Sequence, residues 1–381
     1  MDLVQRAGDY ARVFSLMEAL SKLGHKIFVI IISSESKKPR VSYLKEMGID
    51  VVLIHSFSFG TKKHRGIWRH LKYLSCLPAI SREAKKIINK YGIDYVYSYM
   101  PGTGSSYPAM RIKSKYKIPM ILDLADMYTM VRPKYIVKKS FKEADKILVI
   151  TNYLRNILLK QGISENKIFH VPNGVDLALF NQSRYSQVEL SELRSKLGGE
   201  KLIVFSGSTQ DLSIVIDSAR KVIDKFPKVK YLIIGDHRFA SKSKQVWENK
   251  VKAKGLTDNF IFLGRRPREE IPQYLLCADI CIDSFPNEPY YAAAHPIKVL
   301  EYGACGKPIV ATSVEETSNL IMHQKYGLLA NPEDPDEYAK YLILLLSDSI
   351  LAKKMGLDFE RYVKENFDWQ IIAKRLICKL S

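Results

Sequence analysis

Short apolar stretches typical of strands alternate with amphipathic, helix-like stretches along most of the chain, and this alternation constrains the fold more than any other feature. A first block runs through "KIFVIII", "DVVLIH", "YVYSYM", "MILDLAD" and "KILVIT". A second block contains "KLIVFSGS", "KYLIIGD", "NFIFLG", "DICIDSF" and "KPIVAT". Repeated β–α–β units predict parallel sheets covered by helices on both faces. Two blocks in 381 residues therefore predict an α/β protein with two doubly wound, Rossmann-like domains facing across a cleft.

The net charge of +19 is distributed unevenly along the chain. Residues 1–172 carry 30 Lys or Arg against 13 Asp or Glu, a balance of +17, and the remainder carries 29 against 27, a balance of +2. A lysine-rich solvated surface would explain this, and so would an anionic partner of the first half. Because no helix-turn-helix, zinc-finger or RNP signature is present, we expect no nucleic acid. An anionic membrane surface or a lipid-phosphate acceptor fits the charge, at about 1 kcal/mol per Lys or Arg near such a surface.

Cysteine, histidine and apolar patterns indicate the compartment and exclude some chemistries. Five scattered cysteines favour a reducing environment. The longest apolar run, "IFVIII", has the length of a strand, so no transmembrane helix is predicted. The eight histidines form no HxH or HExxH pattern, and we predict no metal site. We expect a cytoplasmic protein, with a peripheral position on the inner face of the cell membrane as a further expectation.

The stretch "HPIKVLEYGACGKPIVAT" (His295–Thr312) carries the clearest chemical signal. Pro296 suits the first position of a helix, and Lys298 and Glu301 lie three residues apart on one face of it. This helix would begin at the carboxyl end of the strand "DICIDSF", where helix N–H groups form an anion site. Lys298 and those N–H groups would suit a nucleotide diphosphate, with Glu301 accepting ribose hydroxyls. The alternative is a surface Lys–Glu pair worth a few tenths of a kcal/mol.

Four stretches, in this order, resemble glycosyltransferase family 4, whose members have the two-domain GT-B fold. They are "AGDYARVFSLMEALSKLGHKIFVI", "ADKILVITNYLRNILLKQGISENKIFHVPNGVDLALF", the run from "VKYLIIGD" to "NFIFLGRRPREEIPQYLLCADICI", and "HPIKVLEYGACGKPIVAT". The resemblance implies a first, acceptor domain over residues 1–175, joined by the C-terminal helix 365–381, and a nucleotide-sugar donor domain over 176–364. The polar stretch Asn181–Glu200 would bridge the two domains.

The resemblance also implies roles for individual residues. In the second domain, Glu301 would accept ribose hydroxyls, Lys298 would bind the diphosphate, and a glycine turn would approach the phosphates. Asp126, in "DLADMY", would be the catalytic residue facing the sugar or acceptor from the first domain. The residues assigned to donor binding are Gly8, Gly207, Ser208, Arg265, His295, Lys298 and Glu301.

Several positions depart from the family pattern. A second carboxylate often stands eight residues before Glu301, where this chain has Ala293; Glu288 and His295 are the nearby polar candidates. Ser208 replaces an Arg that is common after the glycine of the second domain's first strand, and Arg265 or Arg266 would have to supply that charge.

Two further departures lie in the first domain. Tyr97 and Tyr99 stand at a strand end where family members often have a histidine. The family's first strand has no counterpart in "MDLVQRA", which is too short and polar for a central buried strand. Either the true start lies upstream or the first domain lacks its first strand, which would leave Gly8 on a loose terminus.

The leading hypothesis is a retaining, metal-independent glycosyltransferase of the hexosyltransferase type. It would use a UDP- or GDP-linked sugar as substrate, with no cofactor, and a lipid-phosphate, other lipid-linked or glycan-precursor acceptor. The alternatives are a non-catalytic nucleotide-sugar-binding relative and a nucleotide-sugar epimerase on the same fold. A hydrolase with two carboxylates is disfavoured because no carboxylate pair stands at the expected strand ends.

Overall fold

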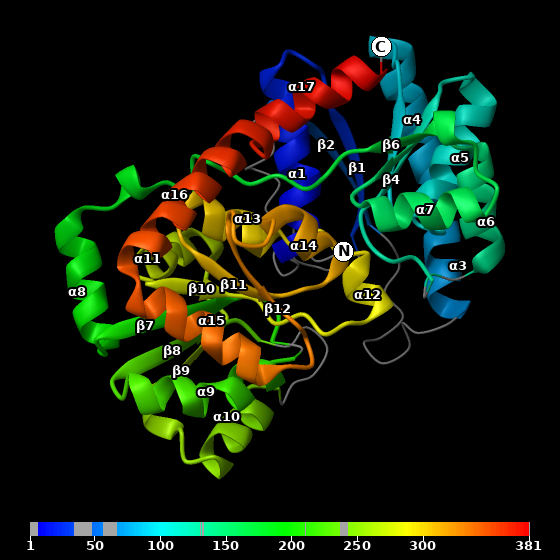
Figure 1. Cartoon of the computed structure of the whole chain (residues 1–381). Coiled ribbons are helices and arrows are strands. Elements are labelled where there is room, and N and C mark those ends of the chain that lie inside the picture. The colour runs from blue at the N-terminus through cyan, green and yellow to red at the C-terminus, as the bar shows by residue number, and fades with distance from the viewer. Residues whose placement is uncertain are drawn as a thin grey trace. The chain divides into compact units, whose positions relative to one another are not determined.

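The chain divides into two compact units in a computed structural model (Figure 1). Unit 1 comprises Met1–Pro172 and Trp369–Ser381, and unit 2 comprises Asn173–Asp368. Both are α/β with parallel sheets, which confirms the prediction of two Rossmann-like parts. The sequence analysis places the divisions a few residues away, after residues 175 and 364. The structure describes residues 7–33, 48–55, 67–129, 131, 133–209, 211–236 and 243–380.

The described strands of unit 1 form two parallel sheets. One pairs β1 with β2, and the other has the order β3-β4-β5-β6. The strands are β1 (Phe28–Ser33), β2 (Asp50–His55), β3 (Val96–Tyr99), β4 (Met120–Leu124), β5 (Lys146–Val149) and β6 (Ile168–His170). The helices are α1 (Ala7–Lys22), α3 (Ile67–Ser75), α4 (Leu77–Tyr91), α5 (Ser106–Tyr116), α6 (Lys134–Glu143), α7 (Asn152–Lys160) and α17 (Trp369–Leu380).

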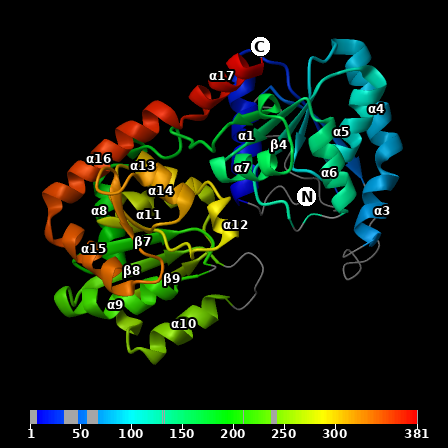
Figure 2. The ribbon, with the colours of Figure 1, turned by 45° about the vertical axis from the view of Figure 1, so that its right-hand side comes forward.

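Helix α1 packs against both sheets of unit 1. Its Phe14 joins Ile31 and Ile49 in one apolar cluster beside β1 and β2. Its Leu16 and Ala19 belong to a second cluster, which includes residues of β4, β5 and α17. Figures 1 and 2 both show α17 lying beside α1. The C-terminal helix is therefore part of the core of unit 1.

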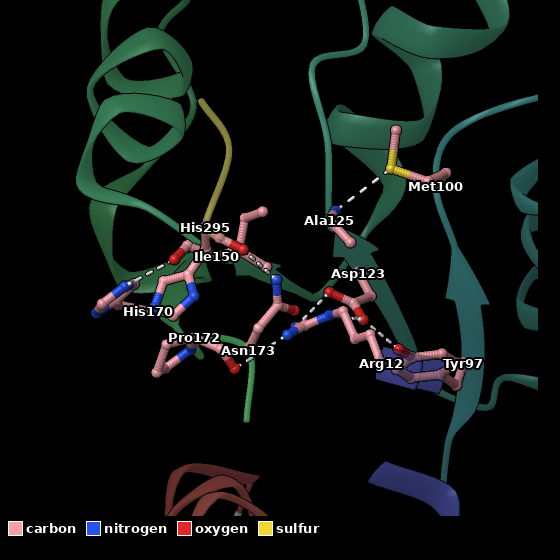
Figure 3. A network of polar contacts seen from close by, with 10 residues as sticks. All are labelled: Arg12, Tyr97, Met100, Asp123, Ala125, Ile150, His170, Pro172, Asn173 and His295. Carbon is pink, nitrogen blue, oxygen red and sulfur yellow. Dashed lines mark hydrogen bonds and ion pairs between the residues drawn. The ribbon is translucent and has the colours of Figure 1, made fainter. Parts of the chain in front are cut away.

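A buried ion pair ties α1 to β4. The Arg12 guanidinium donates from Nε to Asp123 Oδ2 at 2.9 Å and from a terminal nitrogen to Oδ1 at 2.8 Å. The Tyr97 hydroxyl donates to the same carboxylate, and Arg12 also donates to the carbonyl oxygen of Pro172 at 3.0 Å (Figure 3). Burial opposes the charge on Arg12, but Asp123 stabilises it and holds the pKa of the guanidinium above its ordinary value. The contacts of Arg12 and Asp123 thus link α1, β3 and β4 with Pro172, the last residue of the first segment of unit 1.

Unit 2 contains one parallel sheet of six strands in the order β12-β11-β10-β7-β8-β9. The strands are β7 (Lys201–Ser206), β8 (Val229–Ile234), β9 (Phe260–Gly264), β10 (Ile280–Ile282), β11 (Ile309–Thr312) and β12 (Gly327–Ala330). The helices are α8 (Gln187–Leu197), α9 (Ser213–Lys225), α10 (Ser243–Ala253), α11 (Ile271–Leu276), α12 (Pro289–Ala292), α13 (Ile297–Ala304), α14 (Glu315–Ile321), α15 (Pro335–Ser347) and α16 (Ser349–Asn366).

Both faces of this sheet are buried. Along β7, Leu202 and Val204 pack into a core with α11, α13 and α16, while Ile203 and Phe205 pack on the other face with α9 and α15. Continuous apolar runs are expected for parallel strands covered on both sides. The same burial leaves the strand ends as the places where polar side chains can gather.

Helix α8 lies within the stretch that the sequence analysis describes only as a polar connection. The Ser186 side chain accepts from the Glu189 amide at 3.2 Å, and the Glu189 carboxylate accepts from the Ser186 amide at 2.7 Å. This capping box begins the helix. A single apolar residue, Leu190, is buried on α8, so the apolar periodicity that marks other helices is weak there.

The Arg12–Asp123 pair predicts a non-additive stability effect. Arg12→Met leaves a buried carboxylate without its cation, and we expect the free energy of unfolding to fall by about 3–5 kcal/mol. Arg12→Met with Asp123→Leu removes both charges and should recover most of that loss in urea unfolding. The control is Lys22→Met, which breaks the exposed Glu18–Lys22 pair and should cost no more than about 0.5 kcal/mol. Equal destabilisation of the single and double variants would contradict this interpretation.

Candidate functional site

Three neighbouring strands of unit 2 end at glycines with positive φ. The φ angles are 148° at Gly207 after β7, 127° at Gly235 after β8 and 66° at Gly264 in β9. The Gly207 amide donates to Ile234 O at 2.9 Å, and the Gly235 amide donates to Gly264 O at 2.8 Å. A Cβ on Gly235 would lie 1.8 Å from the carbonyl oxygen of Gly207. Glycine is therefore required where these two backbones meet.

Lys298, in the first turn of α13, lies against the Gly207 turn. A Cβ on Gly207 would be 3.1 Å from Lys298 Cδ. The Lys298 ammonium is 2.6 Å from Asp283 Oδ1, and the ion pair is almost wholly buried. The ammonium nitrogen of Lys298 also lies 4.5 Å from the ring centroid of Phe205 and 4.2 Å from that of Phe285. Two residues assigned to the donor site, Gly207 and Lys298, are thus in contact.

Asp283, directly after β10, is the partner of Lys298, and the sequence analysis does not assign it to the site. Its side chain is completely buried. Oδ1 accepts from the Ser284 amide at 2.8 Å, and Oδ2 has no hydrogen-bond partner among the residues that the structure describes. The sequence does contain a signal for this residue: an aspartate ends the apolar strand "DICID". A carboxylate buried there needs a cation or a hydrogen-bond donor, so a partner could have been expected.

Glu301 pairs with Arg268. The Glu301 carboxylate is 3.1 Å from a terminal nitrogen of Arg268, and both side chains are largely buried. Burial raises the pKa of Glu301, and the positive charge of Arg268 opposes that rise. Lys298 and Glu301 share a helix, but each has its own partner on another element. The alternative of a surface Lys–Glu pair is therefore wrong.

The other assigned residues of unit 2 occupy different environments. His295 is buried, its ring lies 5.8 Å from that of Phe367, and its carbonyl oxygen accepts from Asn173 Nδ2 at 2.9 Å (Figure 3). Ser208 and Arg265 are exposed at the ends of β7 and β9. Ala293, at the position of the missing carboxylate, is completely buried.

Gly8 and Asp126 belong to unit 1. Gly8 lies in the first turn of α1, which begins at Ala7. Asp126 follows β4, and its Oδ1 accepts from the Met127 amide at 2.7 Å. This bond gives Asp126 the local turn-capping contact that the short polar side chain favours.

Lys298, the Gly207 turn and the first turn of α13 together favour a bound anion. Glu301, on the same helix, favours an uncharged ligand group that can donate hydrogen bonds, such as a hydroxyl. Pro296 is the N-cap residue of α13, so the first turn of that helix begins one residue later than predicted. Helix N–H groups and a cation next to a glycine turn suit phosphate oxygens. Within the described ranges, no group of three or more His, Cys, Asp or Glu residues could hold a metal ion, and no helix is long and apolar enough to cross a membrane.

Two family models match successive parts of the chain. Residues 11–179 match the model described as Glycosyltransferase Family 4, and residues 191–358 match the model described as Glycosyl transferases group 1. Together with two α/β units built on parallel sheets, these matches define a glycosyltransferase of the GT-B fold. The chain belongs to glycosyltransferase family 4, as its sequence motifs indicate.

Similar proteins include enzymes from archaea and bacteria. The uncharacterized glycosyltransferase MJ1178 of Methanocaldococcus jannaschii is 24% identical over 328 residues, which cover 84% of this chain and 82% of that protein. The alpha-monoglucosyldiacylglycerol synthase of Streptococcus pneumoniae is 24% identical over 344 residues, which cover 85% and 72%. The crystal structure of Anabaena Alr3699/HepE in complex with UDP has a TM-score of 0.73 at 16% identity, with 96% of this chain and 94% of that chain covered.

A further buried acid, Glu316, lies in α14 after β11. It is 4% exposed, and its Oε2 has no hydrogen-bond partner in the described part of the chain. Burial raises the pKa of Glu316 to about 7. The folded chain therefore holds a proton on Glu316 that the unfolded chain releases near its ordinary pKa, so stability falls as the pH rises from about 4.5 to about 7.

Glu316→Gln should remove this pH dependence. The neutral amide needs no proton, so we expect the variant to be more stable than the native protein at pH 8, by about 3 kcal/mol at most. At pH 4.5 the two proteins should differ little. Thermal unfolding at both pH values measures the effect, with Glu315→Gln as the control at the exposed neighbouring position. A gain of the same size at both pH values would contradict the protonation argument.

Proposed function

We propose that this family 4 glycosyltransferase moves a hexose from a UDP- or GDP-linked donor to a lipid-linked or glycan-precursor acceptor, with retention and without a bound metal. The contact between Gly207 and Lys298 at the start of α13 carries the proposal. It puts a cation, a close backbone turn and helix N–H groups at one strand end of unit 2. The leaving nucleoside diphosphate is the group that such a site would stabilise.

The chemistry of transfer gives Lys298 its role. Negative charge develops on the bridging phosphate oxygen as the glycosidic bond breaks. A fixed cation in a low-dielectric site lowers the energy of that charge without reorganisation of solvent. Lys298 is 11% exposed and lies between two aromatic rings, which suits this role. Glu301 would bind the ribose hydroxyls, and the positive charge of Arg268 opposes the rise in the Glu301 pKa that burial causes.

The remaining assignments belong to the same proposal. Asp126 would face the sugar or the acceptor from unit 1. Arg265, His295 and Ser208 would complete the donor site, and Gly8 would allow the backbone of unit 1 to approach the phosphates. Basic side chains and the α13 dipole would balance the charge of the diphosphate.

Charge in unit 1 supports an anionic or membrane-associated acceptor. Unit 1 carries 33 Lys or Arg against 13 Asp or Glu, a balance of +20, and unit 2 carries 26 against 27, a balance of −1. Helix α6 exposes four lysines together with Tyr135, which is 66% exposed. They are Lys134, Lys138, Lys139 and Lys142. A basic helix face with an aromatic ring suits the interface of an anionic bilayer. The pneumococcal relative is named as a synthase of a glucosylated diacylglycerol, which agrees with a membrane-associated acceptor.

Donor binding is tested with a panel of nucleotide sugars in thermal-shift measurements. We expect one UDP- or GDP-sugar to raise the melting temperature of the native protein. Glu301→Ala and Lys298→Met should each remove most of that shift, because they delete the ribose acceptor and the phosphate cation. The control is Glu269→Ala, an exposed carboxylate close to Arg268 in sequence, and it should keep the shift. An unchanged shift in Glu301→Ala would rule out the site assignment.

The acceptor class is tested by release of UDP or GDP in the presence of lipid extracts and by flotation with liposomes. We expect release to require lipid and flotation to require anionic lipid. Lys138→Glu with Lys139→Glu on α6 should reduce flotation severalfold. The matched control is Lys353→Glu with Lys354→Glu, two exposed lysines on α16 of unit 2. Equal binding to neutral and anionic liposomes would end the membrane proposal.

A second candidate function is nucleotide-sugar binding without transfer. The completely buried Ala293 favours it, because the position that often carries a carboxylate here cannot contact a sugar hydroxyl. Donor binding without any release of nucleoside diphosphate, across a full acceptor panel, would identify this function. Release of a changed sugar instead would identify an epimerase.

A further inference from the structure

We infer that Asp283 is a fixed counter-ion of Lys298 that weakens the binding of nucleoside diphosphate and so promotes its release after transfer. The inference rests on the proposed function of the Lys298 site. Asp283 lies outside the motif His295–Thr312, and the inference arises from the contact of this residue, directly after β10, with Lys298 on α13. Lys298 Nζ and Asp283 Oδ1 are 2.6 Å apart, with side-chain exposures of 11% and 0%.

Asp283 is held in place from several sides. Its amide donates to Val310 O on β11 at 3.1 Å, and its carbonyl oxygen accepts from the Tyr338 hydroxyl at 3.0 Å. Its carboxylate accepts from the Ser284 amide at 2.8 Å. Because the backbone and one carboxylate oxygen are fixed, the charge stays near Lys298 when a ligand enters.

The position of Lys298 has support that is independent of Asp283. Its ammonium lies over the rings of Phe205 and Phe285, at 4.5 Å and 4.2 Å from their centroids. Its aliphatic chain packs against the Gly207 turn. These contacts would keep the lysine in place without the carboxylate, so Asp283 is not needed as a support.

The electrostatic consequence has a definite sign. The ion pair is neutral as a whole, and a diphosphate that contacts Lys298 also comes close to a buried negative charge. Like charges repel strongly where water is excluded. Asp283 Oδ2 has no hydrogen-bond partner in the described ranges, so protein donors there do not offset its charge. Asp283 should therefore weaken diphosphate binding and leave the binding of an uncharged nucleoside unchanged.

The test is calorimetric titration of the full-length protein with UDP and GDP, and with uridine and guanosine as uncharged controls. Asp283→Asn keeps the shape of the side chain and removes its charge. We expect it to bind the preferred diphosphate on the order of tenfold more tightly, with the nucleoside affinity unchanged. Product inhibition by the same diphosphate should become stronger by a similar factor.

Lys298→Met provides the second side of a double-mutant cycle. If Asp283 acts on the ligand through its pair with Lys298, Asp283→Asn should gain little in the Lys298→Met background. Asp283→Ser removes the same charge and replaces Asp283→Asn if that variant does not fold.

Three results would overturn the inference. In the first, Asp283→Asn binds diphosphate more weakly, which would make Asp283 a support for Lys298. In the second, nucleoside and diphosphate affinities rise equally, which would show a general change of the site. In the third, the native protein binds diphosphate but Asp283→Asn shows no gain, which rejects this inference alone.

If the native protein binds neither UDP nor GDP, the proposed function itself fails.

Discussion

Burial of both faces of a parallel sheet is the constraint on which the rest of unit 2 depends. Val204 and Phe205 point into opposite cores, so neither face of β7 is available for a ligand. Polar chemistry is confined to the strand ends, where the chain leaves one layer for another. Gly207, Asp283 and the start of α13 all lie at such ends. The site is therefore a direct consequence of how the sheet is covered.

The sequence predicted the fold and part of the site because those features are written in local patterns. Alternating apolar runs predicted two Rossmann-like parts, and the four motifs predicted the family. The contact of Gly207 with Lys298 also follows from local rules, since a glycine turn and a helix start both occur at strand ends. Helix α8 was missed because it buries little apolar surface and is begun by a capping box.

Partner choice could not be predicted, because it depends on distances between segments far apart in the chain. Helical spacing places Lys298 beside Glu301, yet the fold pairs Lys298 with Asp283 and Glu301 with Arg268. Both partners come from segments that the motif does not include. Arg12 and Asp123 are separated by 111 residues and present the same difficulty. A charged residue within an apolar strand shows only that some partner must exist.

The buried ion pairs Arg12–Asp123 and Lys298–Asp283 differ in how completely their polar atoms are paired. Asp123 receives two bonds from Arg12 and one from Tyr97, so the guanidinium fork and the carboxylate are matched. That pair is complete and suits a structural role. The Lys298–Asp283 pair retains a carboxylate oxygen without a partner, and an ammonium can redirect its donors as a ligand arrives. Such an incomplete pair suits the proposed role of Lys298, whose ammonium would add a contact with an anionic ligand while Asp283 stays beside it.

The charge of each unit fits the same division of roles. Unit 2 is almost neutral, and its cations Lys298 and Arg268 are each balanced by a carboxylate. The proposed donor recognition there would depend on short-range geometry, because a neutral site attracts a distant anion weakly. Unit 1 carries the net positive charge of the chain, which includes the exposed lysines on α6. Under the proposed function, long-range attraction would therefore act on an anionic acceptor or surface at unit 1, and no excess positive charge in unit 2 would oppose release of the nucleoside diphosphate.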